Sequence, residues 1–240
     1  MVWRVLVTRP EPAATETAQR LTALGFEAVQ MPLSRTVALA GVSAPEPGTV
    51  EMIAVSSANA IRHAPRLLID ALSRLACFTV GEKTAQAARQ AGFMQVQSAD
   101  GDAHALAAIV IRASGSGARI AYLCGKVRRP DFEDEVRRHD RSVEIFEVYD
   151  TQPLEPSEEE VAQLLGREKV DAVLVYSAAS ARQLVHFMTT CAAAKPLQDA
   201  LFCCLSPRVA AELEGVAARV RVAARMEQEA LFDILQDEAA

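Results

Sequence analysis

The sequence Val55-Ser56-Ser57-Ala58-Asn59-Ala60 ends one apolar run and begins a stretch with helical spacing. A similar sequence, Tyr176-Ser177-Ala178-Ala179-Ser180-Ala181, does the same in the second half of the chain. Each joins a buried-strand pattern to a turn of small polar residues, where backbone N–H groups and hydroxyls can face a ligand. The repeat predicts two similar domains with a site shared between them.

Short apolar runs alternate with helical segments along the whole chain, which predicts parallel sheets with right-handed crossovers. The expected strands are 4–7, 27–31, 52–55, 77–80, 95–97, 119–123, 142–148, 172–176, 201–205 and 219–222. The expected helices include 13–24, 59–72, 83–91, 103–112 and 131–139. Segments 33–39 and 147–151 are expected to be extended, and the Gly- and Pro-containing segment 40–50 is expected to be a loop.

The composition is that of a globular protein with a substantial core: 240 residues, of which 50% are hydrophobic and 23% charged. Aromatic residues make up only 5%, which favours helices packed on parallel sheets over a β-sandwich. The net charge of −6 argues against a nucleic-acid partner, which would require a dominant basic face. No stretch approaches the ~18 apolar residues of a membrane span, so no membrane partner is expected.

The thiols and imidazoles are not spaced as metal ligands. The five cysteines are Cys77, Cys124, Cys191, Cys203 and Cys204. They form no CxxC pair, and most lie in or beside apolar runs, so reduced core thiols are expected. The four histidines are far apart in sequence, and no metal site is predicted. Because the N-terminus has no signal-peptide pattern, a cytoplasmic protein is expected.

Matched turns in the two halves carry matched cations. Thr8-Arg9 aligns with Gly125-Lys126, Ser56 with Ser177, and Gly81-Glu82-Lys83 with Ser206-Pro207-Arg208. All follow expected parallel strands, and ligands of such sheets bind at the carboxyl ends of the strands. Amides, hydroxyls and cations from both halves would suit a polyanionic ligand. We therefore expect Ser56 and Ser177 to border one cleft.

A purely structural explanation of these turns remains open. Ser and Thr before a helix are good N-caps, and Gly81 and Gly125 can serve only to permit tight turns. Tyr149, in an extended segment between the halves, can be an aromatic residue that packs across a linker. The chain has no dinucleotide-binding G-x-G-x-x-G after a strand, no P-loop and no G-x-S-x-G elbow.

Several stretches together resemble uroporphyrinogen-III synthases, in order and with fitting gaps from residue 4 to about 235. They are Leu6-Val7-Thr8-Arg9-Pro10, Val80-Gly81-Glu82-Lys83-Thr84-Ala85, Cys124-Gly125-Lys126-Val127-Arg128-Arg129, Val148-Tyr149-Asp150-Thr151, Tyr176-Ser177-Ala178-Ala179-Ser180-Ala181 and Cys204-Leu205-Ser206-Pro207-Arg208-Val209-Ala210. The resemblance implies two similar parallel-sheet α/β domains joined by a two-stranded antiparallel linker, with the active site in the interdomain cleft. The first domain would comprise 1–35 and 152–240, the second 40–147, and the linker strands 35–39 and 147–151.

The implied reaction closes the linear tetrapyrrole hydroxymethylbilane to uroporphyrinogen III, with inversion of the last pyrrole ring and loss of water. No metal or organic cofactor is implied, and Tyr149 corresponds to the family tyrosine proposed to assist departure of the hydroxyl. The implied substrate-binding residues are Thr8, Arg9, Ser56, Ser57, Asn59, Gly81, Lys83, Thr84, Gly125, Lys126, Ser177, Ala178, Ser206 and Arg208. We expect a monomer in haem biosynthesis and also consider a transient contact with the preceding pathway enzyme.

Two alternatives from other classes stay open. A two-domain binding protein that closes on an anionic small molecule without catalysis would give much the same sequence pattern. A nucleotide-sugar transferase with two facing α/β domains would usually need a longer chain and a recognisable acidic residue for the ribose.

Overall fold

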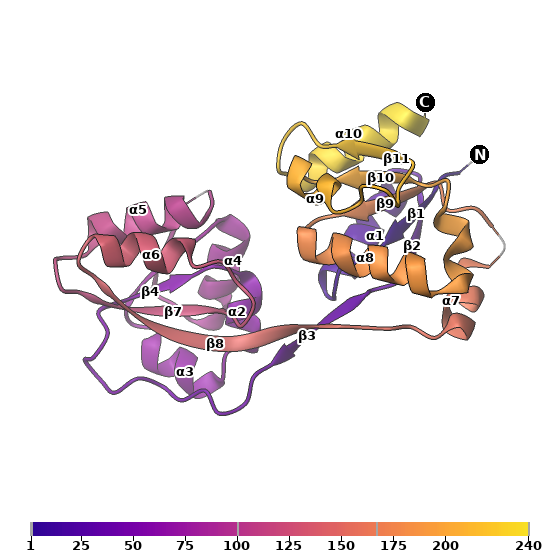
Figure 1. The fold of residues 1–240 in the computed structure, drawn as a ribbon. Helices are drawn as coiled ribbons and strands as arrows, with labels where there is room; N and C mark the ends of the chain where they lie inside the picture. Colours follow the sequence, from indigo (N-terminus) through magenta and orange to yellow (C-terminus); the bar gives the residue numbers. More distant parts are fainter. Residues whose placement is uncertain (1, 100, 167, 240) are drawn as a thin grey trace. The chain divides into compact units, whose positions relative to one another are not determined.

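The computed structural model describes residues 2–99, 101–166 and 168–239. The chain divides into two compact units, and Figure 1 labels helices and strands of each. Unit 1 comprises Met1–Arg35 and Gln152–Ala240, and unit 2 comprises Thr36–Thr151. Unit 1 is therefore formed by two separate segments of the chain, with unit 2 inserted between them.

Unit 1 contains a five-stranded parallel sheet in the order β11-β10-β9-β1-β2. Its strands are β1 (Arg4–Val7), β2 (Glu27–Gln30), β9 (Ala172–Val175), β10 (Leu201–Cys204) and β11 (Arg219–Val222). Its helices are α1 (Ala13–Ala23), α7 (Glu158–Leu165), α8 (Ala178–Thr190), the 3-10 helix η1 (Ala192–Leu197), α9 (Pro207–Ala211) and α10 (Gln228–Ala239).

Along the central strands of unit 1, successive side chains point to alternate faces of the sheet and form two core layers. Leu6 and Val173 pack with side chains of α7, α8 and η1 on one face of the sheet. Val5, Val7 and Leu174 pack with α1 and α10 on the opposite face. Successive side chains of a strand point to opposite faces, so a strand that is apolar throughout requires helices on both faces.

Unit 2 has a six-stranded sheet in the order β3-β8-β7-β4-β5-β6. Its strands are β3 (Ser34–Ala38), β4 (Met52–Val55), β5 (Ala76–Thr79), β6 (Gln95–Ser98), β7 (Arg119–Gly125) and β8 (Ser142–Pro153). Its helices are α2 (Ala58–His63), α3 (Arg66–Leu72), α4 (Glu82–Ala91), α5 (Ala103–Ala113) and α6 (Asp131–Arg138). Helices α2, α3 and α4 cover one face of the sheet, and α5 and α6 cover the other.

Strands β3 and β8 connect the two units. The backbone N–H of Leu39 donates to Val148 (3.0 Å), and that of Leu154 donates to Leu33 (2.8 Å). Partner numbers fall along one strand as they rise along the other, so the two strands run antiparallel. The other neighbouring strands of unit 2 are parallel.

Most expected elements lie within one or two residues of the observed ones, and the predicted α/β class is confirmed. The helix expected over 59–72 is wrong as a single element, because α2 ends at His63 and α3 begins at Arg66. Ala64 is extended (φ −64°, ψ 136°), as expected for the residue before a proline, here Pro65. The expected strand 142–148 is longer and continues to Pro153.

The two sheets have a similar spatial arrangement of strands, but the chain passes through the strands in a different order. The neighbours β10-β9-β1-β2 of unit 1 correspond to β5-β4-β7-β8 of unit 2. Helices α2 and α8 follow the corresponding strands β4 and β9, and Ser57 and Ser177 are their N-caps. The alignment of Ser56 with Ser177 is therefore wrong by one residue, because only Ser57 occupies the capping position.

Candidate functional site

The predicted site residues of unit 2 gather at the carboxyl ends of its parallel strands. Ser56 and Ser57 follow β4, Gly81 follows β5, Gly125 ends β7, and Tyr149 lies in β8 opposite Gly125. These strand ends belong to one sheet edge, which is where open α/β sheets bind ligands.

Tyr149 lies directly across Gly125. A Cβ atom built on Gly125 would lie 2.6 Å from Cζ, 2.8 Å from Cε2 and 2.9 Å from the hydroxyl oxygen of Tyr149. Carbon atoms in normal contact are 3.5–4.0 Å apart, so no residue with a Cβ fits here while the ring keeps its place. The glycine is required by this close approach of the ring.

Burial makes the Tyr149 phenol harder to ionise than an exposed tyrosine. The half-buried position raises the pKa of Tyr149, and a hydrogen bond with the Ser57 side chain opposes that rise. The phenol is thus neutral at neutral pH and can donate a proton, while Ser57 favours the charged form. The Ser57 Oγ also accepts a hydrogen bond from the Asn59 backbone N–H (3.1 Å) and so caps α2.

His63 completes this group and was missed by the sequence reasoning. Its ring centroid lies 6.1 Å from that of Tyr149. Burial, and next the charge of Arg62, lower the pKa of His63, which favours the neutral imidazole. Its position shortly after the Ser56-Ser57 turn could have indicated a place near the site. The sequence reasoning considered the histidines only as metal ligands.

Two cations, Lys126 and Arg128, lie in the turn that follows β7. The Lys126 backbone N–H donates to the Tyr149 carbonyl (2.8 Å), and Lys126 Nζ lies 3.9 Å from Asp150 Oδ2. Arg128 contacts Glu133 and Glu147, each at 2.7 Å. Lys126 is exposed, whereas Arg128 is held by its two carboxylates.

The remaining predicted residues of unit 2 lie in the turn that begins α4. Gly81 is the N-cap, and its carbonyl accepts a hydrogen bond from the Thr84 backbone N–H (3.0 Å). Thr84 is buried, and Lys83 is exposed. This turn thus offers a cation and backbone amides at the end of β5, beside the Ser57 turn at the end of β4.

In unit 1, the predicted residues occupy the corresponding strand ends. Ser177 and Ser180 form a reciprocal capping box at the start of α8, where Ala178 is buried. Ser206 is the N-cap of α9, and the side chain of Arg208 is exposed there. The capping role given as the structural explanation is therefore present at Ser177, whereas the side chain of Ser206 makes no capping hydrogen bond.

Arg9 has its guanidinium engaged within unit 1. It lies 4.0 Å from the centroid of the Tyr176 ring and donates to Gln228 Oε1 (2.9 Å) and Thr17 Oγ1 (3.3 Å). Thr8 is 2% exposed, and its carbonyl accepts a hydrogen bond from the Leu33 backbone N–H. Both residues therefore support the packing of unit 1 around the end of β1.

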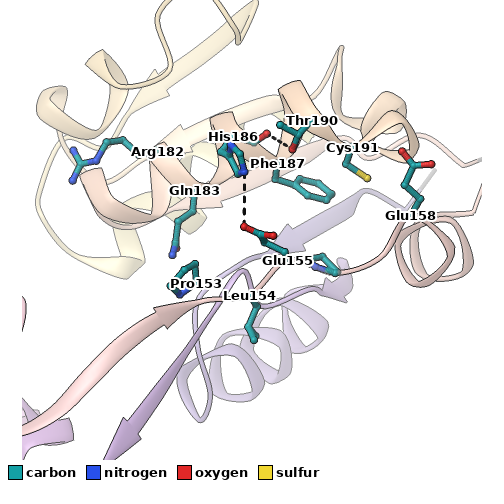
Figure 2. Close-up of a pocket in the computed structure, with 11 residues that line it drawn as sticks. Pro153, Leu154, Glu155, Glu158, Arg182, Gln183, His186, Phe187, Thr190 and Cys191 are labelled. Atoms are coloured by element: carbon teal, nitrogen blue, oxygen red, sulfur yellow. Dashed lines mark hydrogen bonds and ion pairs between the residues drawn. The ribbon is translucent and has the colours of Figure 1, made fainter. Parts of the chain in front are cut away.

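A cavity of about 630 Å³ lies elsewhere in unit 1, between α8 and the segment that follows β8 (Figure 2). Phe187 and Leu154 contribute apolar surface, and His186 lies 4.0 Å from Glu155. No predicted site residue lines this cavity. Among the described residues, no group of three or more His, Cys, Asp or Glu side chains is arranged to hold a metal ion, and no helix is long and apolar enough to cross a membrane.

Comparisons with known proteins agree with this architecture. Uroporphyrinogen-III synthetase from Helicobacter pylori 26695 is 14% identical, with a TM-score of 0.69 over 99% of this chain and 100% of that one. A mutant uroporphyrinogen III synthase from the extremely thermophilic bacterium Thermus thermophilus is 18% identical, with a TM-score of 0.56 over 99% of this chain and 98% of that one. These likenesses show the fold. None of the curated proteins matches the chain.

The family model described as uroporphyrinogen-III synthase HemD matches residues 15–233, which is most of the chain. That span includes the Tyr149 site of unit 2 and the strand ends of unit 1 at Ser177 and Ser206. The chain belongs to the uroporphyrinogen-III synthase HemD family, whose enzymes act in tetrapyrrole biosynthesis.

Proposed function

We propose that this protein is a cyclising hydro-lyase that converts hydroxymethylbilane to uroporphyrinogen III with inversion of the last pyrrole ring. The observation that carries the proposal is the position of the Tyr149 phenol, which lies across Gly125 at the carboxyl edge of the sheet of unit 2. It places a proton donor at the sheet edge where α/β proteins bind ligands.

The proposed reaction requires the protein to position the substrate and to assist one proton transfer. Tyr149 either transfers its proton to the departing hydroxyl or donates a hydrogen bond while solvent supplies the proton. The hydroxyl leaves as water, and an azafulvene cation forms. The substituted carbon of the last ring attacks this cation, giving a spiro intermediate that fragments and recloses with the ring inverted. Loss of a proton completes the product, so substrate and product differ by one water molecule.

Ser57 and the substrate both stabilise the phenolate form of Tyr149. If the proton is transferred, the phenolate accepts the hydrogen bond of the Ser57 hydroxyl and lies next to the azafulvene cation. Both interactions favour the phenolate over the phenol. Since uncatalysed closure gives the non-inverted isomer, holding the last ring for attack by its substituted carbon is the second task.

The eight carboxylates of the substrate explain the strand-end turns of both units. We propose contacts through backbone N–H groups, hydroxyls and cations at Thr8, Arg9, Ser56, Ser57, Asn59, Gly81, Lys83, Thr84, Gly125, Lys126, Ser177, Ala178, Ser206 and Arg208. Lys83, Lys126 and Arg208 are exposed and supply charge, whereas the caps supply amides at helix N-termini. No metal or organic cofactor enters the proposed steps.

The location and partner follow from the substrate. Because hydroxymethylbilane closes spontaneously to the wrong isomer, a transient contact with the enzyme that makes it would shorten its exposure to water. We propose that both act in the cytoplasm, where reduced thiols such as the buried Cys77 and Cys203 persist.

One assay tests the proposed function. Hydroxymethylbilane is generated enzymatically, the protein is added, and the oxidised uroporphyrin isomers are resolved and quantified. We expect mainly isomer III, whereas a control without the protein gives isomer I. Isomer I alone in the presence of the folded protein would refute the proposal, and substrate binding without turnover would favour the non-catalytic binding protein.

A further inference from the structure

We propose that Arg128 is a positioning residue that fixes a β-bulge in β8 and thereby directs Tyr149 toward α2; this inference rests on the proposed role of Tyr149. Arg128 joins β7, α6 and β8 without contacting the phenol itself. Its contacts lie on both sides of the irregularity from which Tyr149 projects.

The bulge changes the face to which Tyr149 points. Cys124 of β7 pairs with Glu147, but the next residue, Gly125, pairs with Tyr149, so Val148 is the extra residue. In a regular strand Glu147 and Tyr149 would share one face. Instead, both Val148 and Tyr149 pack against the core cluster that includes α2, and a bulge of this kind redirects a side chain.

Arg128 holds the two strands at the bulge. Its Nη1 donates to Glu147 Oε1 (2.7 Å) immediately before the extra residue on β8. The same nitrogen donates to the carbonyl of Gly125 (3.2 Å), the last residue of β7, and to that of Lys126 (3.4 Å), which follows it. One guanidinium group therefore binds Glu147 of β8 and Gly125 of β7, the residue that pairs with Tyr149. These contacts fix the register of β7 and β8 beside Tyr149.

A third arm anchors Arg128 to the interior. Its Nε donates to Glu133 Oε1 (2.7 Å), and Glu133 is 3% exposed. Glu133 Oε2 has no hydrogen-bond partner among the described residues. Burying a carboxylate and a guanidinium costs desolvation free energy, and an apolar pair in the same place has no such cost. A role in fixing the bulge accounts for an ion pair that stability alone does not favour.

A double-mutant cycle tests whether Arg128 acts through Tyr149. Arg128→Gln is measured in the wild-type and Tyr149→Phe backgrounds by the rate of isomer III formation from enzymatically generated hydroxymethylbilane. We expect kcat to fall about tenfold in the wild-type background, with KM changed less than about twofold, and to change less than about twofold when Tyr149 is already Phe. Equal losses in both backgrounds, or a rise in KM alone, would overturn the inference.

Two further variants keep the test decisive. Glu147→Gln weakens only the β8 arm at a partly exposed carboxylate and should show the same dependence on Tyr149 if Arg128→Gln fails to fold. Arg119→Gln is the matched control, because its ion pair with Glu144 (3.2 Å) links the opposite ends of β7 and β8; it should leave kcat unchanged. If Tyr149→Phe itself leaves kcat unchanged, the proposed role of Tyr149 fails instead, and the two failures are distinguishable.

Discussion

Gly125 and Tyr149 occupy paired positions on β7 and β8, and the phenol ring lies where a side chain of residue 125 would begin. The glycine at the end of β7 is thus explained by Tyr149 of the neighbouring strand β8. The glycine is needed because a Cβ at this position would occupy the space of the ring.

Gly125→Ala should displace the Tyr149 ring and lower kcat by at least about tenfold, since small misplacements of a catalytic group cost about this much or more. The measurement is the rate of isomer III formation, with circular dichroism to verify folding. Gly115→Ala is the matched control: a Cβ there meets nothing within 4 Å, and kcat should be unchanged. Equal rates for Gly125→Ala and wild type would contradict the close contact.

Tyr149→Phe removes only the hydroxyl and should lower kcat by at least several-fold, because the departing hydroxyl loses its proton donor. Steady-state kinetics with isomer analysis measures the effect. Tyr176→Phe makes the same chemical change in unit 1 and should leave kcat within about twofold of wild type. Unchanged kinetics for Tyr149→Phe would remove this residue from the mechanism.

Ser57→Ala should raise the pKa of Tyr149 further, because the Ser57 hydrogen bond now opposes the effect of burial. Ultraviolet difference titration measures it, with Tyr149→Phe identifying the signal. Losing the N-cap of α2 should also cost about 1 kcal/mol of stability. Ser177→Ala removes the equivalent cap in unit 1 at similar cost, and the Tyr149 titration should not move; a shift there would indicate a general effect of destabilisation.

Lys83→Ala combined with Arg208→Ala should mainly raise KM, because both cations are proposed to bind substrate carboxylates rather than the reacting atoms. The same double change at Arg66 and Arg225, which form exposed ion pairs with Asp70 and Asp233, controls for lost charge. Raising ionic strength should reduce the difference from wild type. A purely reduced kcat would speak against carboxylate binding.

Stability should fall steeply at alkaline pH. Burial raises the pKa of the Cys77, Cys124, Cys203 and Cys204 thiols from 9.0 to about 12. Above pH 9 the unfolded chain loses these protons while the folded chain keeps them, so the free energy of unfolding decreases as pH rises toward 12. Urea titrations under reducing conditions from pH 7 to 10.5 measure this slope.

Cys203→Ala removes one of these four thiols and should make the alkaline slope shallower, whatever its effect on stability at pH 7. A slope identical to that of the wild type would show that the Cys203 thiol ionises as freely in the folded protein as in the unfolded chain.

The sequence predicted the elements of the fold because their causes are local. Short, wholly apolar runs such as 52–55 and 201–204, bounded by turn residues, favour strands buried on both faces, and Gly92 ends α4 with a left-handed conformation (φ 106°). The break at Pro65 was also readable, since proline restricts the residue before it. The shift between Ser56 and Ser57 was not, because both are good caps and only the end of β4 distinguishes them.

The sequence by itself determined the α/β class and the strand-end turns, since hydrophobic period and residue type are properties of the local chain, whereas the role expected of Tyr149 came from the resemblance to a family. Only the tertiary structure decided what surrounds Tyr149. Gly125 lies opposite Tyr149 because one extra residue, Val148, shifts the pairing of β7 with β8. His63 of α2 lies beside the ring, and Arg128 binds the strand residues next to it. A single-residue bulge reverses the face of every side chain after it, and its position follows from contacts between distant strands that no local pattern records.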